Sequence, residues 1–399
     1  MAIWSNLAGT VTGYIRLGLT GPRLKNSAGE LAVRNAGDTA YAKAQIADGT
    51  AANHAVSKGQ LDTKQPLDAT LTAIADESIG AFSYRNKIIN GKMEIAQRGT
   101  SFPAIANGTY SLDRWKYLNT STAVVTASQQ FDVPSNEFQN SLRVAVTTAD
   151  TSIAAGDFSF LVQAVEGYNA RDLLGRTFTI SFWARSSKTG THCVSLSNSA
   201  TDRSYVAEYA INTANTWEFK SITVSGGLTT AGTWGWANGI GVETRFALAA
   251  GPSFQTTAGA WQTGNFLATA NQVNCLDTID NIFAITGVQL EVGSVATPFE
   301  HRPIGVESAL CQRYYLNMGG VVLSPCGTAG SGQPVTPVWY PFPVHMRASP
   351  TINVPASGGI NIDSATATAS ALGIVARIII NSAGYGYADF TFNNASAEL

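Results

Sequence analysis

Short stretches in which apolar and polar residues alternate, separated by Gly, Asn and Ser, recur along most of the chain. Alternation with a period of two is typical of half-buried β-strands. Between residues 86 and 303 it predicts strands at 141–146, 158–165, 177–185, 193–196, 205–211, 218–224, 243–249 and 282–292. Short strands at this spacing predict a mainly β unit in the form of a two-sheet sandwich.

The pattern changes at residue 304, where apolar residues take helical spacing. Val306, Ala309 and Leu310, followed by Arg313 and Tyr314, predict a short amphipathic helix. Strands then follow at 320–323, 338–342, 376–381 and 387–392. We therefore expect a small β-rich C-terminal domain over residues 304–399.

Residues 1–35 predict only small pieces of structure. Residues 14–20 alternate as a strand, Gly21 and Pro22 end it, and residues 24–34 predict a hairpin. Pieces of this size bury little apolar surface alone. We expect them to be stabilised by neighbouring chains or by a larger particle.

Residues 36–85 have few aromatic residues. The apolar residues Leu67, Leu71 and Ile74 are spaced by four and three, and Pro66 rules out one long helix. Two interpretations remain: a flexible linker, or a thin oligomeric stalk in which short helices pack against symmetry mates.

Composition excludes several function classes. Charged residues are only 13% of the chain and the net charge is −2, which gives no electrostatic footprint for nucleic acid. No apolar run approaches the ~20 residues of a membrane span, so no membrane insertion is expected. The first residues do not read as a secretory signal. The four Cys and four His lack metal-ligand spacing, so we expect no metal and no cofactor.

The sequence carries none of the common catalytic motifs considered below. The chain has no GxSxG, HExxH or P-loop pattern. The carboxylate pairs Asp277 with Asp280 and Glu291 with Glu300 do not by themselves indicate a glycosidase, which needs two carboxyls facing one cleft. No catalytic residue is assigned, and no enzyme activity is expected.

Several motifs carry a resemblance. Gly287–Pro303 followed at once by Ala309–Tyr315 resembles the junction, in bacteriophage tail-fibre proteins, between a carbohydrate-binding-like sandwich and a C-terminal tip. Further phrases similar to such fibres are 53–62, 65–71, 88–99, 110–115 and 341–351. The resemblance implies a homotrimer on the virion, made in the host cytoplasm. It implies a tail-attachment region over 1–35, a trimeric stalk over 36–85, a jelly-roll-like sandwich over 86–303 and a tip over 304–399.

The resemblance leaves three functions open. The first is a tail fibre that binds a host surface receptor, a glycan or a protein, while its N-terminus binds tail or baseplate proteins. The second is a virion structural or decoration protein that binds only other virion proteins. The third is a polysaccharide-degrading tailspike enzyme. We expect the first, because the chain is rich in aromatic residues and sugars stack on flat rings.

Candidate ligand-binding residues are therefore aromatic residues in loops and their polar neighbours. Trp234, Trp236 and Asn238 lie in a Gly-rich stretch, and Trp261 lies in another apparent loop. The Trp pair is either a platform on which a sugar ring stacks or a plug over the core.

Two further groups of aromatic residues are candidates for contacts with other molecules. Near the C-terminus, Trp339, Tyr340, Tyr385 and Tyr387 either contact a receptor or fill a small trimeric core. Trp183 lies on the face of its strand opposite Phe178, Ile180 and Phe182, and is either a groove residue or a subunit contact. We expect the subunit contact, together with Leu67, Leu71 and Ile74. Trp115 is expected to be structural, and Arg114 to be held by a carboxylate.

Overall fold

The computed structural model describes residues 14–16, 23–27, 30–34, 39, 84–229, 231–353 and 356–399. The chain divides into two compact units, Met1–Thr72 and Ala73–Leu399. In the first unit, β1 (Tyr14–Arg16), β2 (Arg23–Ser27) and β3 (Glu30–Arg34) form an antiparallel sheet, which includes the predicted hairpin. The proposed stalk contacts Leu67, Leu71 and Ile74 lie outside the described residues.

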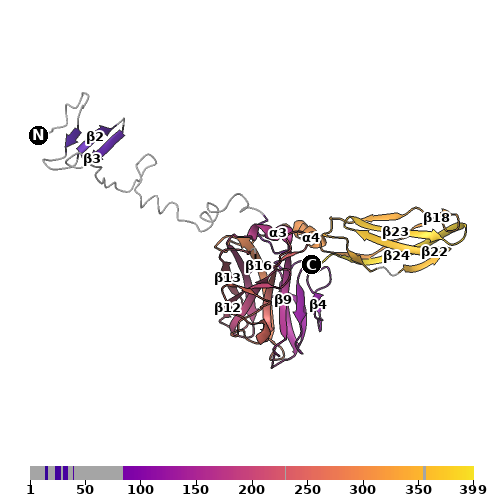
Figure 1. The fold of residues 1–399 in the computed structure, drawn as a ribbon, viewed down its shortest axis with the longest axis horizontal. Helices are drawn as coiled ribbons and strands as arrows, with labels where there is room; N and C mark the ends of the chain where they lie inside the picture. The colour runs from indigo at the N-terminus through magenta and orange to yellow at the C-terminus, as the bar shows by residue number, and fades with distance from the viewer. Residues whose placement is uncertain are drawn as a thin grey trace. The chain divides into compact units, whose positions relative to one another are not determined.

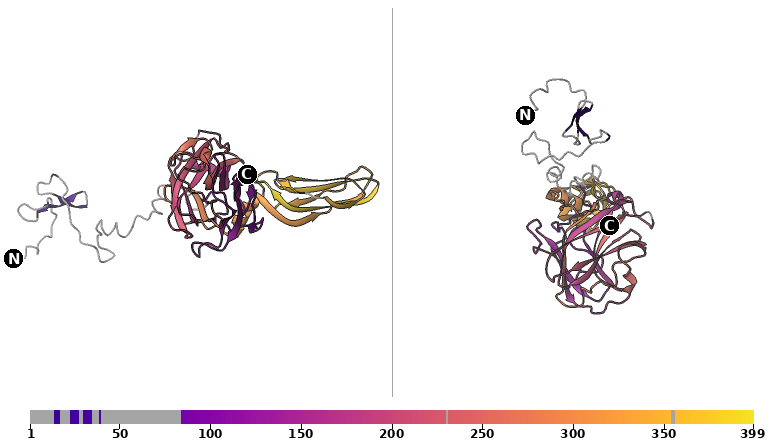
Figure 2. Two further views of the ribbon diagram at one scale, coloured as in Figure 1. Left: turned by 90° about the horizontal axis from the view of Figure 1, so that it is seen from below. Right: turned by 90° about the vertical axis from the view of Figure 1, so that its left-hand side faces the viewer.

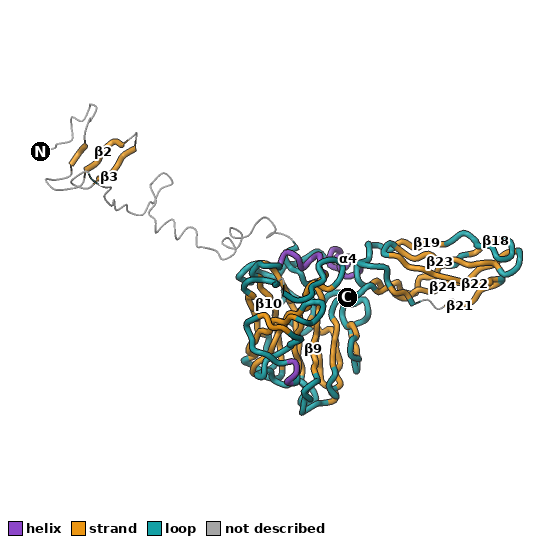
Figure 3. The backbone as a smooth tube through the Cα atoms, viewed as in Figure 1, coloured by secondary structure: helices purple, strands orange, loops and turns teal. Residues whose placement is uncertain are grey.

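Two antiparallel sheets form a sandwich between residues 101 and 292 (Figure 1). The six-stranded sheet contains, in order, β13 (Glu218–Val224), β10 (Phe178–Ser186), β16 (Ile282–Val292), β8 (Ser141–Thr148), β7 (Val124–Gln130) and β4 (Ser101–Phe102). The seven-stranded sheet contains β15 (Trp261–Thr263), β12 (Arg203–Ile211), β11 (Gly190–Ser197), β14 (Ile240–Ala250), β9 (Phe158–Glu166), β6 (Lys116–Asn119) and β5 (Thr109–Tyr110). The helices here are short: α3 (Gly167–Ala170), η2 (Arg171–Leu173) and η3 (Pro252–Phe254) (Figure 3).

The sandwich core lies between the two sheets. Phe182 of β10 packs edge-on against Phe246 of β14, with ring centroids 4.9 Å apart. Trp115 lies 6.0 Å from the same Phe246 ring, is fully buried, and donates its Nε1 hydrogen to the Asn90 carbonyl at 3.1 Å. Each buried aromatic side chain contributes about 1.5–3 kcal/mol by removing apolar surface from water.

The outer face of the seven-stranded sheet, turned away from this core, is partly covered. The segment 264–269, which follows β15, lies over it: Leu267 is buried in one cluster with Phe160 of β9 and Val206 of β12, and the half-buried Phe254 packs against this cluster. The outer face is therefore apolar beneath this segment, and a groove remains beside it.

The C-terminal region contains α4 (Ile304–Gln312) and two further antiparallel sheets, whose strands run side by side (yellow in Figure 2). In one sheet β24 (Gly384–Ser396) pairs with β17 (Tyr315–Leu323), β18 (Cys326–Ala329), β20 (Thr351–Ile352) and β21 (Ala356–Ile360). The other sheet has the order β19 (Val338–Pro341), β23 (Gly373–Ile380) and β22 (Ile362–Ser370). The C-terminal region has a hydrophobic core of its own, which includes Ile378, Phe390 and Phe392. The protein is thus mainly β, with a jelly-roll-like sandwich and a small β-rich C-terminal domain.

The predicted short helix is confirmed as α4, and its most buried residues include a carboxylate. Glu307 and Cys311 are buried, whereas Val306, Ala309 and Leu310 are only half-buried. The Glu307 carboxylate is satisfied inside the fold, because it accepts hydrogen bonds from the Asn90 N–H and from Arg302 Nη1, the latter at 3.3 Å. Leu310 packs against the buried Cys311 and Tyr314, so the helix has an apolar side as predicted, and the burial of Glu307 is the feature that the spacing did not predict.

Candidate functional site

A groove with a volume of 290 Å³ lies on the outer face of the seven-stranded sheet. This volume is near the lower end of the range for small-molecule sites. Its floor comes from β6, β9 and β14, and one wall comes from Asn265 and Leu267 of the covering segment. The lining residues are Tyr110, Arg114, Lys116, Leu118, Phe158, Phe160, Val162, Ala164, Thr201, Ile240, Glu243, Arg245, Asn265, Leu267 and Leu399.

Strand register places these side chains in rows across the sheet. Leu118 of β6, Phe160 of β9 and Ala247 of β14 are paired neighbours and form an apolar row. Lys116, Val162 and Arg245 form the next row, where cations flank an apolar residue. β9 provides both faces, because Leu161 and Val165 point into the core while Phe160 and Val162 point into the groove.

The polar side of the groove is ordered by Arg245. This buried guanidinium donates Nε and Nη2 to Glu243 Oε2 at 2.8 and 2.5 Å, and Nη1 to Asn265 Oδ1 at 2.7 Å. It also lies 5.5 Å from the centre of the Phe160 ring. Glu243 Oε1 and the Asn265 amide nitrogen make no hydrogen bond with the described part of the chain. The groove thus offers an apolar floor together with one fixed acceptor and one fixed donor.

The structure brings three predicted tryptophans together, but on the core side of the sandwich. The rings of Trp234 and Trp236 stack with centroids 5.5 Å apart, and Trp261 meets Trp234 edge-on at 5.6 Å. Trp234 is 9% exposed and packs within the main core, while Trp236 and Trp261 are half-buried against it. The sequence analysis left two roles open for Trp234, a platform on which a sugar stacks or a plug over the core. The burial of Trp234 favours the plug over the core. Asn238 is exposed, and its carbonyl accepts a hydrogen bond from Arg347 at 2.6 Å.

The other predicted contact residues lie away from the groove. Trp183 is half-buried on the outer face of the six-stranded sheet, with its ring 5.5 Å from that of Phe219. Its neighbour Thr179 on that face is buried, because residues after β16 fold over it and Gly293 accepts its hydroxyl hydrogen at 2.8 Å.

In the C-terminal domain the four predicted aromatic residues divide into two pairs. Trp339 is 48% exposed and Tyr385 is 58% exposed. Tyr340 and Tyr387 are half-buried. Trp339 lies on the edge strand β19, consistent with the prolines that flank it.

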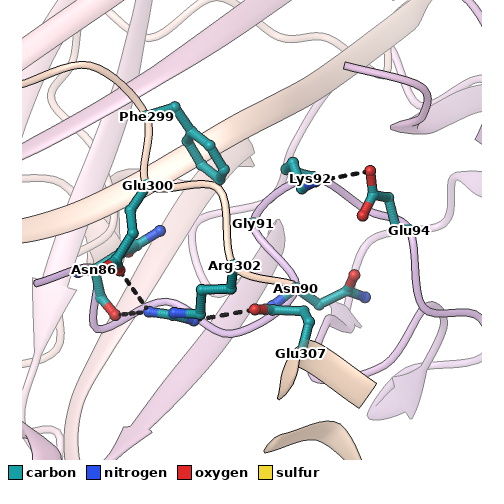
Figure 4. Close-up of a pocket in the computed structure, with 9 residues that line it drawn as sticks. All are labelled: Asn86, Asn90, Gly91, Lys92, Glu94, Phe299, Glu300, Arg302 and Glu307. Carbon is teal, nitrogen blue, oxygen red and sulfur yellow. Dashed lines mark hydrogen bonds and ion pairs between the residues drawn. The ribbon is translucent and has the colours of Figure 1, made fainter. Parts of the chain in front are cut away.

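A second pocket, at the junction between the sandwich and α4, has a structural role (Figure 4). Its volume of 10 Å³ holds about one water molecule. Arg302 points across it to Glu300 at 3.2 Å and to Glu307, and it also donates to the Ile88 carbonyl at 3.1 Å. Glu300 in turn accepts the Asn86 N–H at 3.0 Å. Glu300, which the sequence analysis named as a possible partner of Glu291, therefore helps to hold the junction between the sandwich and α4.

The described residues contain no cluster of three His, Cys, Asp or Glu side chains that could hold a metal ion. In the same part of the chain, no helix is long and apolar enough to cross a membrane. Among the described residues that line the groove, Glu243 is the one acidic side chain.

The groove itself was missed from the sequence. Its signal was present in β9, where Phe158, Phe160 and Val162 alternate with the inward residues Leu161 and Val165. A strand with apolar residues on both faces predicts that its second face is covered or binds something. The sequence analysis predicted a sandwich strand at 158–165 and drew no conclusion from its second apolar face.

No family model matches this sequence, and no curated protein matches it. Comparison with solved structures retrieves the enzymatically active domain of bacteriophage CBA120 tailspike protein 4, at 18% identity and a TM-score of 0.29. That match covers 53% of this chain and 22% of the tailspike chain, so this chain spans about a fifth of it.

Carbohydrate-binding modules are also retrieved. TmCBM61 in complex with beta-1,4-galactotriose matches at 10% identity and a TM-score of 0.26, covering 52% of this chain and 99% of that one. The family 11 module from Clostridium thermocellum, in complex with a mixed-linked tetrasaccharide, matches at 12% identity and a TM-score of 0.28, covering 50% and 98%.

Proposed function

We propose that this protein is a bacteriophage tail fibre that binds a host cell-surface glycan in the groove of its seven-stranded sheet. The observation that carries the proposal is the row arrangement of the groove, with Leu118 and Phe160 beside Lys116 and Arg245. Sugar rings have apolar faces and a rim of hydroxyls, so they fit a site with an apolar floor and fixed polar groups.

The polar groups fit hydroxyl recognition. Glu243 Oε1 accepts a hydroxyl hydrogen, and the Asn265 amide nitrogen donates to a hydroxyl oxygen. Both are held by Arg245, so little side-chain entropy is lost when a ligand binds. Recognition is non-covalent in this proposal, because glycosidases use a pair of facing Asp or Glu side chains and the described groove lining has one acidic side chain, Glu243.

The wider assignment follows the sequence resemblance. The fibre is a homotrimer on the virion, residues 1–35 attach it to tail or baseplate proteins, and residues 36–85 form the stalk. Three weak sites per fibre, repeated over several fibres, gain avidity through effective concentration.

The test is binding of the full chain to an array of bacterial lipopolysaccharides and capsular polysaccharides. Glu243→Gln, which replaces a charged acceptor by a neutral one, and Asn265→Ala, which removes the donor, should each weaken binding about tenfold. Glu137→Gln is the matched control, since this exposed carboxylate pairs with His301 in the sandwich, away from the groove. Unchanged binding by both groove variants would exclude the groove. Binding to virion proteins but to no glycan would favour the structural role.

A further inference from the structure

One end of the groove is built by a segment that follows the last strand of the C-terminal domain. Leu399 lines the groove together with Tyr110 and Arg114. The Tyr110 hydroxyl donates to the Leu399 carbonyl at 2.6 Å. Residues of the sandwich and of the C-terminal domain therefore meet in this wall.

The segment is held by ion pairs on its sandwich side. Glu398 accepts hydrogen bonds from Arg114 Nη1 and from Arg98 Nη2, the latter at 2.9 Å. Arg114 is 1% exposed and also donates to the Ala164 carbonyl at 2.6 Å, beside the groove floor. Its guanidinium lies 3.6 Å from the centre of the Tyr314 ring. A buried guanidinium that lost its carboxylate would be left uncompensated, so the pair strongly favours the held position.

The C-terminal domain holds the same segment from its own side. Arg347 donates Nε to the Ala397 carbonyl at 2.7 Å and Nη2 to the Glu398 carbonyl at 2.9 Å. The Ala397 N–H donates to the Tyr314 carbonyl at 2.7 Å. Residues 397–399 are thus fixed in a single position by both parts of the molecule.

We propose that residues 397–399 are a wall of the glycan groove, positioned by the Glu398–Arg114 pair. Ligand binding in the sandwich is then coupled to the contact between this C-terminal segment and the sandwich. The inference rests on the proposed glycan-binding function. Coupling is reciprocal: a ligand that contacts Leu399 and Tyr110 binds more tightly when residues 397–399 contact the sandwich, and the bound ligand stabilises that contact in turn. Leu399 determines which sugars fit at this end, and Glu398 is a positioning residue.

The experiment uses the full chain, the same panel of lipopolysaccharides and capsular polysaccharides, and hydrogen exchange at the Ala397 amide. Leu399→Ala should weaken binding about tenfold, because apolar contacts in a pocket discriminate at this level. Its Ala397 exchange in the absence of glycan should match the parent. Glu398→Gln should both accelerate that exchange and weaken binding. In the parent, bound glycan should slow the exchange. Leu372→Ala, at an exposed leucine of the C-terminal domain, is the matched control and should change neither.

Three outcomes would overturn the proposal. Leu399→Ala binding as tightly as the parent, while Glu243→Gln binds weakly, would leave the groove as the site and remove the wall. Equal Ala397 exchange in the parent and Glu398→Gln would show that the ion pair does not hold the segment. A parent that binds no member of the panel would refute the proposed function and with it the ligand contact of Leu399.

Discussion

Arg313 donates two hydrogen bonds to Glu166, from Nε at 3.1 Å and from Nη2 at 2.7 Å. This pair joins the residue after α4 to the last residue of β9, 147 positions earlier. The Tyr314 hydroxyl donates to the same carboxylate at 2.8 Å. The hydrogen bonds to Glu166 raise the pKa of Arg313, so its charge is fixed.

Arg313→Leu should destabilise the protein more than Glu166→Gln does. Glu166 is almost fully buried, whereas about a third of the Arg313 side chain reaches solvent. Removal of the arginine leaves a buried carboxylate without its counter-charge, at a cost of about 3–5 kcal/mol. Removal of the carboxylate leaves an arginine that water can solvate. Urea unfolding of both variants checks the order, and equal losses would contradict it.

Tryptophan truncations should affect stability in the order Trp115, Trp234, Trp236. Trp115→Ala opens a cavity in the centre of the core and should cost about 3–5 kcal/mol. Trp236 is half-buried, so Trp236→Ala should cost about 1 kcal/mol. Thermal unfolding measures the order. If Trp236→Ala instead abolishes glycan binding without loss of stability, the ring is a binding platform.

The free energy of unfolding should fall in mild acid because of the buried His192. Burial between the rings of Tyr209 and Phe283 lowers the pKa of His192, although a hydrogen bond to the Lys188 carbonyl opposes the shift. The unfolded chain binds a proton as pH falls through about 6.5, whereas the folded chain does not. The stability contributed by neutral His192 is therefore present above that pH and is lost as pH falls towards the lower folded-state pKa.

Denaturant midpoints between pH 7.5 and 5 measure this dependence. His192→Phe should flatten it, because an aromatic ring is kept and the titration is removed. Leu372→Ala, which removes an exposed leucine and no titrating group, should keep the parental slope. An unchanged slope in His192→Phe would exclude His192 as the source.

Gly167→Ala should displace the loop that carries Trp234 and Trp236. A Cβ at Gly167 would lie 1.8 Å from the Gly235 carbonyl oxygen, and the Gly167 N–H donates to the Gly239 carbonyl at 2.8 Å. Overpacking of this kind costs about 1–3 kcal/mol. Gly156→Ala is the matched control, because nothing lies within 4 Å of its added Cβ. Calorimetry should separate the two variants, and equal melting temperatures would refute the expected clash.

The full chain should sediment as a trimer at micromolar concentration. The proposal follows from the resemblance of residues 53–62 and 65–71 to fibre shafts and from exposed aromatic residues such as Trp339 and Tyr385. Covering these rings removes apolar surface from water. Analytical ultracentrifugation or mass photometry gives the mass directly, and a monomer would contradict the fibre assignment.

The strands were largely predictable from the sequence, and the site was not. The predicted strands 218–224 and 282–292 match β13 and β16 residue for residue. Their alternation is a local property, so it can be read without knowing the partner strands. β22 was missed, because its alanines and threonines give little contrast between its two faces.

Long-range pairing accounts for most of what was missed. Arg114 was expected to meet a carboxylate, and it does, but the partner Glu398 is 284 residues away. Nothing local marks Glu398, or the pairing of Val162 with Lys116 on one side and Arg245 on the other that forms part of the groove. Sequence spacing predicted α4 but not the burial of its Glu307, because a carboxylate is taken to be exposed wherever its partner is unknown.

The edge of β22 has a consequence for how copies of this protein associate. Among the described strands it pairs only with β23, and its nine residues include one charge, Asp363, and no proline. A bare, nearly uncharged edge accepts another strand readily. Addition that closes on itself after a fixed number of copies ends in a discrete particle, whereas addition that does not close continues into fibres. If copies of this protein add to one another at this edge, its geometry decides between a defined assembly and open-ended growth.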